Sequence, residues 1–350
     1  MIADGVTEAF QLQAMLSPQL GSPLYGQLLE AATADLQRRG VIAEVVDGWQ
    51  GHAVADALAL RLLGAVHYLV LDGVAPELAR YYPSAGGTPQ WPQAWDAFLE
   101  VVNAHRDFIR SRLGRQVQTN EVNRSAALLG GFLHIAAHTG LPLRLFEIGS
   151  SAGLNLLWDR YRYEVATHRW GDPTSSVLIR STWHGAPQAL TAAVRVDGRF
   201  GCDLHPINLR DAGQVRTLES FVWPDQVERL AQLRAAIALA QATPPRLSRQ
   251  TASTWLRDQL GSAPRDITTV VFHSIMWWYL PEDERDAVTR VIAERGARAS
   301  RTSPLAWLQF EVRGEQNADL AVRIWPGGDE LVLARCHPHG REVWWSESQA

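Results

Sequence analysis

The sequence predicts an α/β protein with a helical N-terminal part, a sheet with parallel strands, and a closing antiparallel hairpin. Three observations support this prediction. Apolar residues recur with helical spacing from Val6 to about Gly140. After Pro142, short apolar runs alternate with amphipathic stretches, which is the order that builds a parallel sheet. Near the end of the chain, two strand-like runs flank the turn at 326–329.

The helical part is predicted from start and stop signals along the chain. Ser22 and Pro23 are typical of a helix start, and glycines at 40, 114 and 140 are typical helix ends. The predicted helices are Leu24–Arg39, Ala53–Leu71, 92–113 and 121–138, the last with Asn120 as its candidate cap. Together they predict a helical cap domain over residues 1–140.

The α/β domain is predicted over residues 141–350. Its first strand, Leu143–Ile148, leads through a glycine-bearing turn into a helical stretch at 154–161. A region at about 162–200 does not fit the alternation and predicts an inserted β-rich subdomain. The remaining predicted elements are strands 268–273 and 305–312, the helix 282–295 between them, and the hairpin strands 320–325 and 330–336.

The composition excludes several chemistries. The chain has 350 residues, with 33 basic and 37 acidic side chains, and every basic residue is an arginine. A Schiff-base lysine, lysine-bound pyridoxal phosphate and a phosphate-loop lysine are therefore excluded. The formal charge of -4 argues against a nucleic-acid partner.

Other features of the sequence indicate a cytoplasmic protein. Cys202 and Cys336 are too few for a disulfide framework, and the first residues lack a basic region followed by an apolar run. The longest apolar stretch, 53–71, contains charged residues, so we expect a buried helix and no membrane partner.

The turn after the first strand has a pattern suited to a cofactor. Glycines let a ligand approach the backbone, and the N–H groups at a helix start lie beside it. The string at this turn is Glu147-Ile-Gly149-Ser-Ser151-Ala-Gly153-Leu-Asn155. It resembles the first motif of class I S-adenosylmethionine-dependent methyltransferases, with Ser151 where the middle glycine is usual.

A second resemblance extends over nearly the whole chain. It rests on the blocks at 118–124, 146–156, 222–226, 273–274 and 325–328. These blocks resemble a bacterial family of unknown function with a methyltransferase-like fold. The two resemblances imply a Rossmann-like methyltransferase sheet and S-adenosylmethionine as cofactor, contacted by Glu147, Gly149, Ser151, Gly153 and Asn155. The implied substrate is a small molecule.

An acidic residue at the end of the second parallel strand usually holds the cofactor ribose in such proteins. Asp203 is the candidate, although it follows Glu147 by 56 residues, whereas about 20 is usual in dinucleotide folds. The inserted subdomain would explain the excess. The alternative is that Asp203 caps the turn before Pro206.

The same turn also matches G-x-S-x-G, the nucleophile elbow of α/β-hydrolases. Ser151 would be the nucleophile, Glu311 the acid, and His337 or His339 the base. Against this reading, helices rather than strands precede the turn, and no His-Gly-Gly segment for an oxyanion hole lies upstream.

The end of the strand at 268–273 should face the ligand crevice, because open α/β sheets bind ligands beyond the carboxyl ends of their strands. His273 is therefore a candidate catalytic base for the methyl acceptor. Ser274 and Trp277 are candidate substrate contacts. The alternative is that His273 orders the turn and Trp277 belongs to the core.

The block at 118–124 carries a dense set of polar side chains. If it reaches the crevice, Arg124 could pair with the cofactor carboxylate, and Gln118 and Asn120 could contact substrate. The alternative is capping by Asn120. His134 and His138 are four residues apart but lack an obvious third ligand, so we expect no metal site.

These observations predict S-adenosylmethionine-dependent methyl transfer to a small molecule. Two alternatives stay open: a serine esterase that uses Ser151, and a non-catalytic methyltransferase-like protein that binds a ligand or partner.

Overall fold

The computed structural model of the chain describes residues 4–346, apart from 116, 166, 186, 188, 262–263 and 315–316. Contacts divide the chain into two compact units. The helical unit comprises Met1–Thr119 and Arg210–Arg234, and the sheet unit comprises Asn120–Leu209 and Ala235–Ala350. Among the described residues, no helix is both long and apolar enough to cross a bilayer.

The helical unit is built around one apolar core. Its helices are α1 (Asp4–Gln19), α2 (Pro23–Gln37), α3 (Val41–Val46), α4 (Leu58–Leu71), α5 (Pro76–Ala79), η1 (Pro83–Ala85), α6 (Gln93–Ala104), α7 (Arg106–Leu113) and α9 (Ala212–Ser220). Ser22 caps α2, since its side chain accepts a hydrogen bond from Tyr25 N, and Pro23 is its first residue. The helix predicted at 92–113 is two helices, because the backbone leaves helical geometry at His105 (φ -123°).

The block at 222–226 is part of this helical unit. Asp225 accepts a hydrogen bond from the Ser22 hydroxyl at the start of α2, and the Gln226 amide donates to Leu20 O at 3.0 Å. The ring of Trp223 lies 6.0 Å from that of Tyr25. Polar and aromatic contacts therefore join this late segment to the first two helices.

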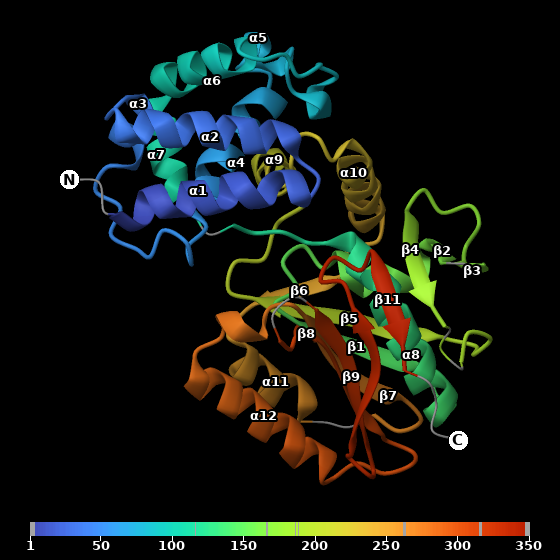
Figure 1. The fold of residues 1–350 in the computed structure, drawn as a ribbon. Helices are drawn as coiled ribbons and strands as arrows, with labels where there is room; N and C mark the ends of the chain where they lie inside the picture. The colour runs from blue at the N-terminus through green and yellow to red at the C-terminus, as the bar shows by residue number, and fades with distance from the viewer. Residues whose placement is uncertain are drawn as a thin grey trace. The chain divides into compact units, whose positions relative to one another are not determined.

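The sheet unit contains an eleven-stranded, mixed but mostly parallel sheet in the part of the chain that the structure describes (Figure 1). The strands are β1 (Leu143–Ile148), β2 (Arg162–Val165), β3 (His168–Gly171), β4 (Leu178–His184), β5 (Val196–Asp203), β6 (Arg246–Arg249), β7 (Thr268–Ser274), β8 (Leu305–Val312), β9 (Ala318–Trp325), β10 (Glu330–Cys336) and β11 (Glu342–Trp345). Their order is β3-β2-β4-β11-β10-β9-β8-β7-β1-β5-β6. The fold is therefore mixed α/β, as predicted.

Parallel pairing dominates the centre of the sheet. Strand β1 pairs in parallel with β5 on one side and β7 on the other, and β5 with β6 and β7 with β8 are also parallel. The hairpin of β9 and β10 is antiparallel, as predicted, but β11 follows it. Strands β2 to β4 lie within the region predicted as an insertion. They join the same sheet through the pairing of β4 with β11.

Helices cover the two faces of the central strands. Besides α10 (Val227–Ala242), which crosses the boundary between the units, the helices here are η2 (Val122–Arg124), α8 (Ser125–Thr139), η3 (Leu154–Arg160), α11 (Ala252–Leu260), η4 (Trp277–Tyr279) and α12 (Glu282–Gly296). Leu308 of β8 touches Gly131 of α8, whereas its neighbour Trp307 belongs to the core cluster of α11 and α12. Because successive side chains of a strand point to opposite faces, α8 covers one face and α11 with α12 the other (Figure 1).

Candidate functional site

The carboxyl ends of β1, β5 and β7 lie side by side and bring most of the candidate residues together. The order of the chain reverses here, since β5 and β6 extend from one side of β1 and β7 and β8 from the other. Such a switch point is where open α/β sheets bind ligands. Gly149 directly follows β1, and Asp203 and Ser274 are the last residues of β5 and β7.

The turn after β1 is a tight glycine-bearing turn with a left-handed backbone. Gly149, Ser151 and Gly153 have φ values of 65°, 52° and 72°. A Cβ on Gly153 would lie 2.7 Å from Pro245 Cγ, and one on Gly149 would lie 3.0 Å from Met276 Cγ and Cε. Side chains at both glycines would therefore be strained and crowded, while Ser151 adopts a conformation that glycine adopts more easily.

Asp203, at the end of β5, is bonded to this turn. Its Oδ2 accepts from Ser151 N at 2.9 Å, and its Oδ1 accepts from His205 N at 2.8 Å. The second bond is the local capping considered as an alternative role for Asp203. Each carboxylate oxygen can accept a further hydrogen bond, so the capping role does not prevent contact with a ligand.

The segment before α8 contacts the end of the glycine turn and the start of η3. Asn120 Oδ1 accepts from Leu154 N at 3.0 Å, so Asn120 caps η3 instead of the helix that follows it. Asn155 Nδ2 donates to Glu121 O at 3.3 Å. Gln118 falls in the helical unit, whereas Asn120 and Arg124 belong to the sheet unit.

Arg124 is half-buried at the end of β7. Its Nη1 donates to Ser274 O at 2.9 Å and its Nε to Pro338 O at 3.2 Å. The positive charge of its guanidinium also influences the pKa of Glu147, a side chain that is only 2% exposed. Burial and then the charge of Asp203 raise the pKa of Glu147 well above its usual value, and Arg124 opposes this shift.

Several oxygen atoms around the turn are buried and lack a hydrogen-bond partner among the described residues. They are Glu147 Oε2, Ser151 Oγ and Asn155 Oδ1. Buried polar atoms in native proteins are nearly always partnered. All three are oxygens, so a donor such as an ammonium or hydroxyl group would satisfy them.

His273 lies on the other face of the sheet from Glu147. Glu147 is in register with Phe272, whereas His273 follows Phe272 in β7 and points the opposite way. The His273 side chain is 0% exposed, its ring stacks on Trp277 at 4.8 Å, and its Nδ1 lies 2.6 Å from Glu311 Oε1. The rings of Trp277 and Trp307 lie beside His273, and no part of its side chain is open to a substrate in this structure.

Sequence reasoning missed two contacts of this site. Glu311, considered only as a hydrolase acid, is the partner of His273. Met276 packs against Gly149 and so joins the loop after β7 to the glycine turn. The signal that could have found Glu311 is an acidic residue inside a buried, mostly apolar strand, where it is the penultimate residue of β8. Among the described residues, no group of three or more His, Cys, Asp or Glu is placed to hold a metal ion.

The chain matches the family described as "Uncharacterized protein conserved in bacteria" (DUF2332) over residues 7–345. Because this match spans nearly the whole chain, the protein belongs to that family. A search of curated proteins finds no match.

Proposed function

We propose that the protein binds S-adenosylmethionine at the glycine turn and transfers its methyl group to a small molecule. The observation that carries the proposal is the hydrogen bond between the turn after β1 and Asp203 at the end of β5. It lies at the switch point of strands ordered β6-β5-β1-β7-β8. In chain order these are parallel strands 3-2-1-4-5, the arrangement of nucleotide-binding Rossmann folds.

The unpartnered atoms support a ligand of this kind. Glu147 Oε2, Ser151 Oγ and Asn155 Oδ1 call for a donor, and the α-ammonium group of S-adenosylmethionine is one. Arg124 offers a guanidinium for the carboxylate of the same ligand. Asp203 can accept bonds from ribose hydroxyls on the lone pairs that Ser151 and His205 leave unused.

The bound sulfonium would supply an electrophilic methyl group, and the chain would supply alignment. A displacement at carbon depends mainly on holding the acceptor in line with the methyl group. The loop after β7, which carries Met276 and Trp277, lies against the glycine turn through the contact of Met276 with Gly149. We assign His273 the ordering of this loop, because Glu311 bonds both His273 and the backbone of the loop.

The esterase alternative has less support from the side-chain contacts. Among the described residues, Ser151 Oγ has no hydrogen bond to a histidine or to any other group. Glu311 is bonded to His273 and not to His337 or His339. A serine hydrolase requires a base in reach of the nucleophile.

Calorimetry and thermal shift with S-adenosylmethionine and S-adenosylhomocysteine test the proposal. A ligand at about 100 times its Kd should stabilise the protein by roughly 2.7 kcal/mol. Asp203→Asn should weaken S-adenosylhomocysteine about tenfold, because a charge-assisted bond contributes about 1.5 kcal/mol or more. Asp172→Asn is the matched control, since Asp172 also caps a turn two residues on, at Thr174.

Three outcomes separate the alternatives. Binding that is lost in Asp203→Asn and kept in Asp172→Asn supports the proposed site. No binding, together with labelling of Ser151 by a fluorophosphonate, would establish the esterase. Binding without methyl transfer to any acceptor in a small-molecule extract would indicate the non-catalytic protein.

A further inference from the structure

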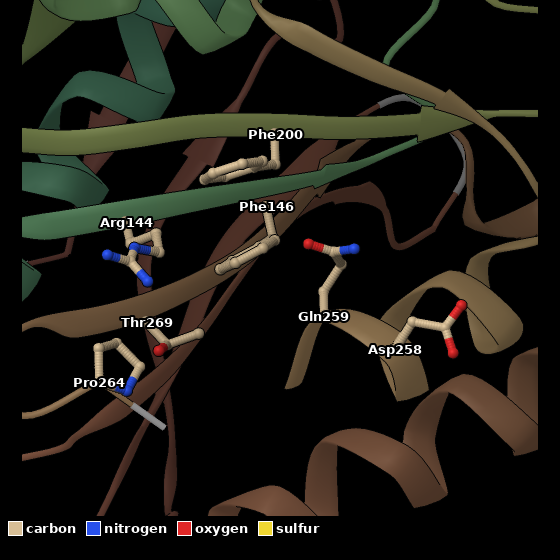
Figure 2. Close-up of a pocket in the computed structure, with 7 residues that line it drawn as sticks. All are labelled: Arg144, Phe146, Phe200, Asp258, Gln259, Pro264 and Thr269. Atoms are coloured by element: carbon tan, nitrogen blue, oxygen red, sulfur yellow. The ribbon is translucent and has the colours of Figure 1, made fainter. Parts of the chain in front are cut away.

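A cavity of about 180 Å³ lies on the α11 face of the sheet, away from the glycine turn. Its lining residues are Arg144, Phe146, Phe200, Asp258, Gln259, Pro264 and Thr269 (Figure 2). Arg144 is the second residue of β1 and Thr269 the second of β7, so the cavity lies towards the amino ends of these strands. We propose that it binds a small planar aromatic carboxylate with a hydrogen-bond donor at the far end of its ring.

Three polar side chains of the cavity have no hydrogen bond within the described part of the chain. They are the hydroxyl of Thr269, a residue only 2% exposed, the half-buried amide of Gln259 and the exposed carboxylate of Asp258. Figure 2 shows the Gln259 amide directed towards the Phe146 ring. A buried polar group normally has a partner, so the Thr269 hydroxyl indicates a polar ligand or ordered water in the cavity.

Arg144 is held in place for an anion. Its Nε and Nη2 both lie 2.7 Å from Asp197 Oδ2, which uses one edge of the guanidinium. The edge formed by Nη1 and Nη2 keeps N–H groups in the geometry that binds a carboxylate through two parallel hydrogen bonds. Asp197 thus orients Arg144 and leaves this second edge for a ligand.

The aromatic wall selects a flat ligand. Phe146 and Phe200 stack with their ring centroids 5.3 Å apart and an interplanar angle of 16°. Arg246 covers Phe200 with its guanidinium 5.6 Å from the ring centroid. Rings favour offset-stacked or edge-to-face contacts with other rings, and a cavity of about 150 Å³ can hold benzene. One substituted six-membered ring therefore fits the volume.

The far side of the cavity specifies the other end of the ligand. The Gln259 carbonyl on α11 is an acceptor, and Figure 2 shows it across the Phe146 ring from Arg144, while the carboxylate of the neighbouring Asp258 is directed away from the rings. An amino or hydroxyl group of the ligand would be bound by the Gln259 carbonyl, and the negative charge of Asp258 nearby disfavours a carboxylate at this end. The ligand is thus oriented with its carboxylate at Arg144 and its donor at α11.

The test uses 4-aminobenzoate, benzoate and aniline as probes in calorimetry and saturation-transfer NMR. A ligand of this size is expected to bind with a Kd of about 1 mM or tighter. 4-Aminobenzoate should bind most tightly, benzoate several-fold more weakly, and aniline not measurably. A negative result with these probes would not affect the proposed function, because S-adenosylhomocysteine binding is tested separately and its proposed site lies at the carboxyl ends of the strands.

Variants assign the binding to this cavity. Arg144→Gln should weaken 4-aminobenzoate at least tenfold, and Thr269→Val, which keeps the shape of the side chain, about threefold. Arg180→Gln is the matched control, because Arg180 is paired with Glu164 on β2 and β4 and lies outside the cavity. If Arg144→Gln does not fold, Thr269→Val and Gln259→Ala decide the assignment. Equal binding of benzoate and aniline, unchanged affinity in the folded variants, or no binding of any probe would overturn the proposal.

Discussion

The Nδ1 atom of His273 lies 2.6 Å from Oε1 of Glu311, and both side chains are buried between the sheet and the loop after β7. The same carboxylate accepts from Met276 N at 3.1 Å and from Trp277 N at 3.3 Å. One carboxylate therefore fixes the histidine ring and the loop that contacts the glycine turn. From the sequence alone, His273 was a candidate catalytic base and Glu311 a candidate hydrolase acid, with no link between them.

Glu311→Ala should lower the free energy of unfolding by about 3 kcal/mol. It leaves the His273 ring and two backbone N–H groups without their acceptor, and each bond to a buried charge contributes about 1.5–3 kcal/mol. Urea denaturation measures this. Glu330→Ala is the control, because Glu330 pairs with Arg313 and Arg323 at the surface and should lose less than about 1 kcal/mol. Equal losses in the two variants would show that the Glu311 contacts contribute little.

The buried strands of the fold could be predicted because each contains a run of branched or aromatic apolar residues. Strand β8 has the predicted bounds Leu305–Val312, and β7 extends the predicted strand by one residue. Strand β6, Arg246–Arg249, escaped prediction, since an exposed edge strand with two arginines lacks that signal. The break at His105 was not predicted, because apolar residues continue with helical spacing on both sides of it.

The residues of the site were easier to predict than their arrangement. Glycines at 149 and 153 identify the turn because the left-handed backbone requires them. That Glu147 and His273 face opposite sides of the sheet depends on the register between β1 and β7, which alternation within one strand cannot supply. For the same reason, no local pattern joins Arg144, Gln259 and Thr269 into one cavity.

Asp225→Ala should loosen the segment 210–234 from the helical unit. Asp225 accepts from the Ser22 hydroxyl, and Ser22 in turn caps α2, so the variant removes a half-buried contact and weakens a helix start. We expect a loss of about 1–2 kcal/mol and faster hydrogen exchange in α9. Asp211→Ala, which removes the cap of α9 itself, is the comparison. Protection of α2 from hydrogen exchange that falls only in Asp225→Ala would support the contact between Asp225 and Ser22. Unchanged protection of α2 in that variant would contradict it.

Ser151→Gly should stabilise the protein by up to about 1 kcal/mol, because glycine adopts a positive φ without the strain of a side chain. It should weaken S-adenosylhomocysteine a few-fold, because it removes Ser151 Oγ, one of the three acceptors proposed for the ligand ammonium group, while an esterase would lose all activity. Ser150→Gly is the neighbouring control. Ser150 has no positive φ, and its hydroxyl donates to Cys202 O at 3.3 Å, so we expect it to destabilise. Unchanged affinity in Ser151→Gly, or a loss of the same size in Ser150→Gly, would contradict the assignment of Ser151 Oγ to the ligand.

Glu147 should link ligand binding to proton release. Burial raises the pKa of its carboxyl group in the folded protein, so the group holds a proton at pH values where an exposed glutamate is ionised. An arriving ammonium group favours the carboxylate and expels that proton. The binding enthalpy of S-adenosylhomocysteine should therefore depend on the ionisation enthalpy of the buffer, and its affinity should rise with pH.

The same shift fixes the sign of the effect on stability. A folded-state pKa above the unfolded value stabilises the protein fully below the unfolded pKa, and this contribution is lost as the pH rises through the folded pKa. The unliganded protein should lose stability with rising pH from about 4.5 upward, and Glu147→Gln should remove that part of the slope. Glu164→Gln is the control, since Glu164 is paired with Arg180 at the surface. A pH slope that is equal in both variants would show that Glu147 is ionised in the free protein and that ligand binding there releases no proton.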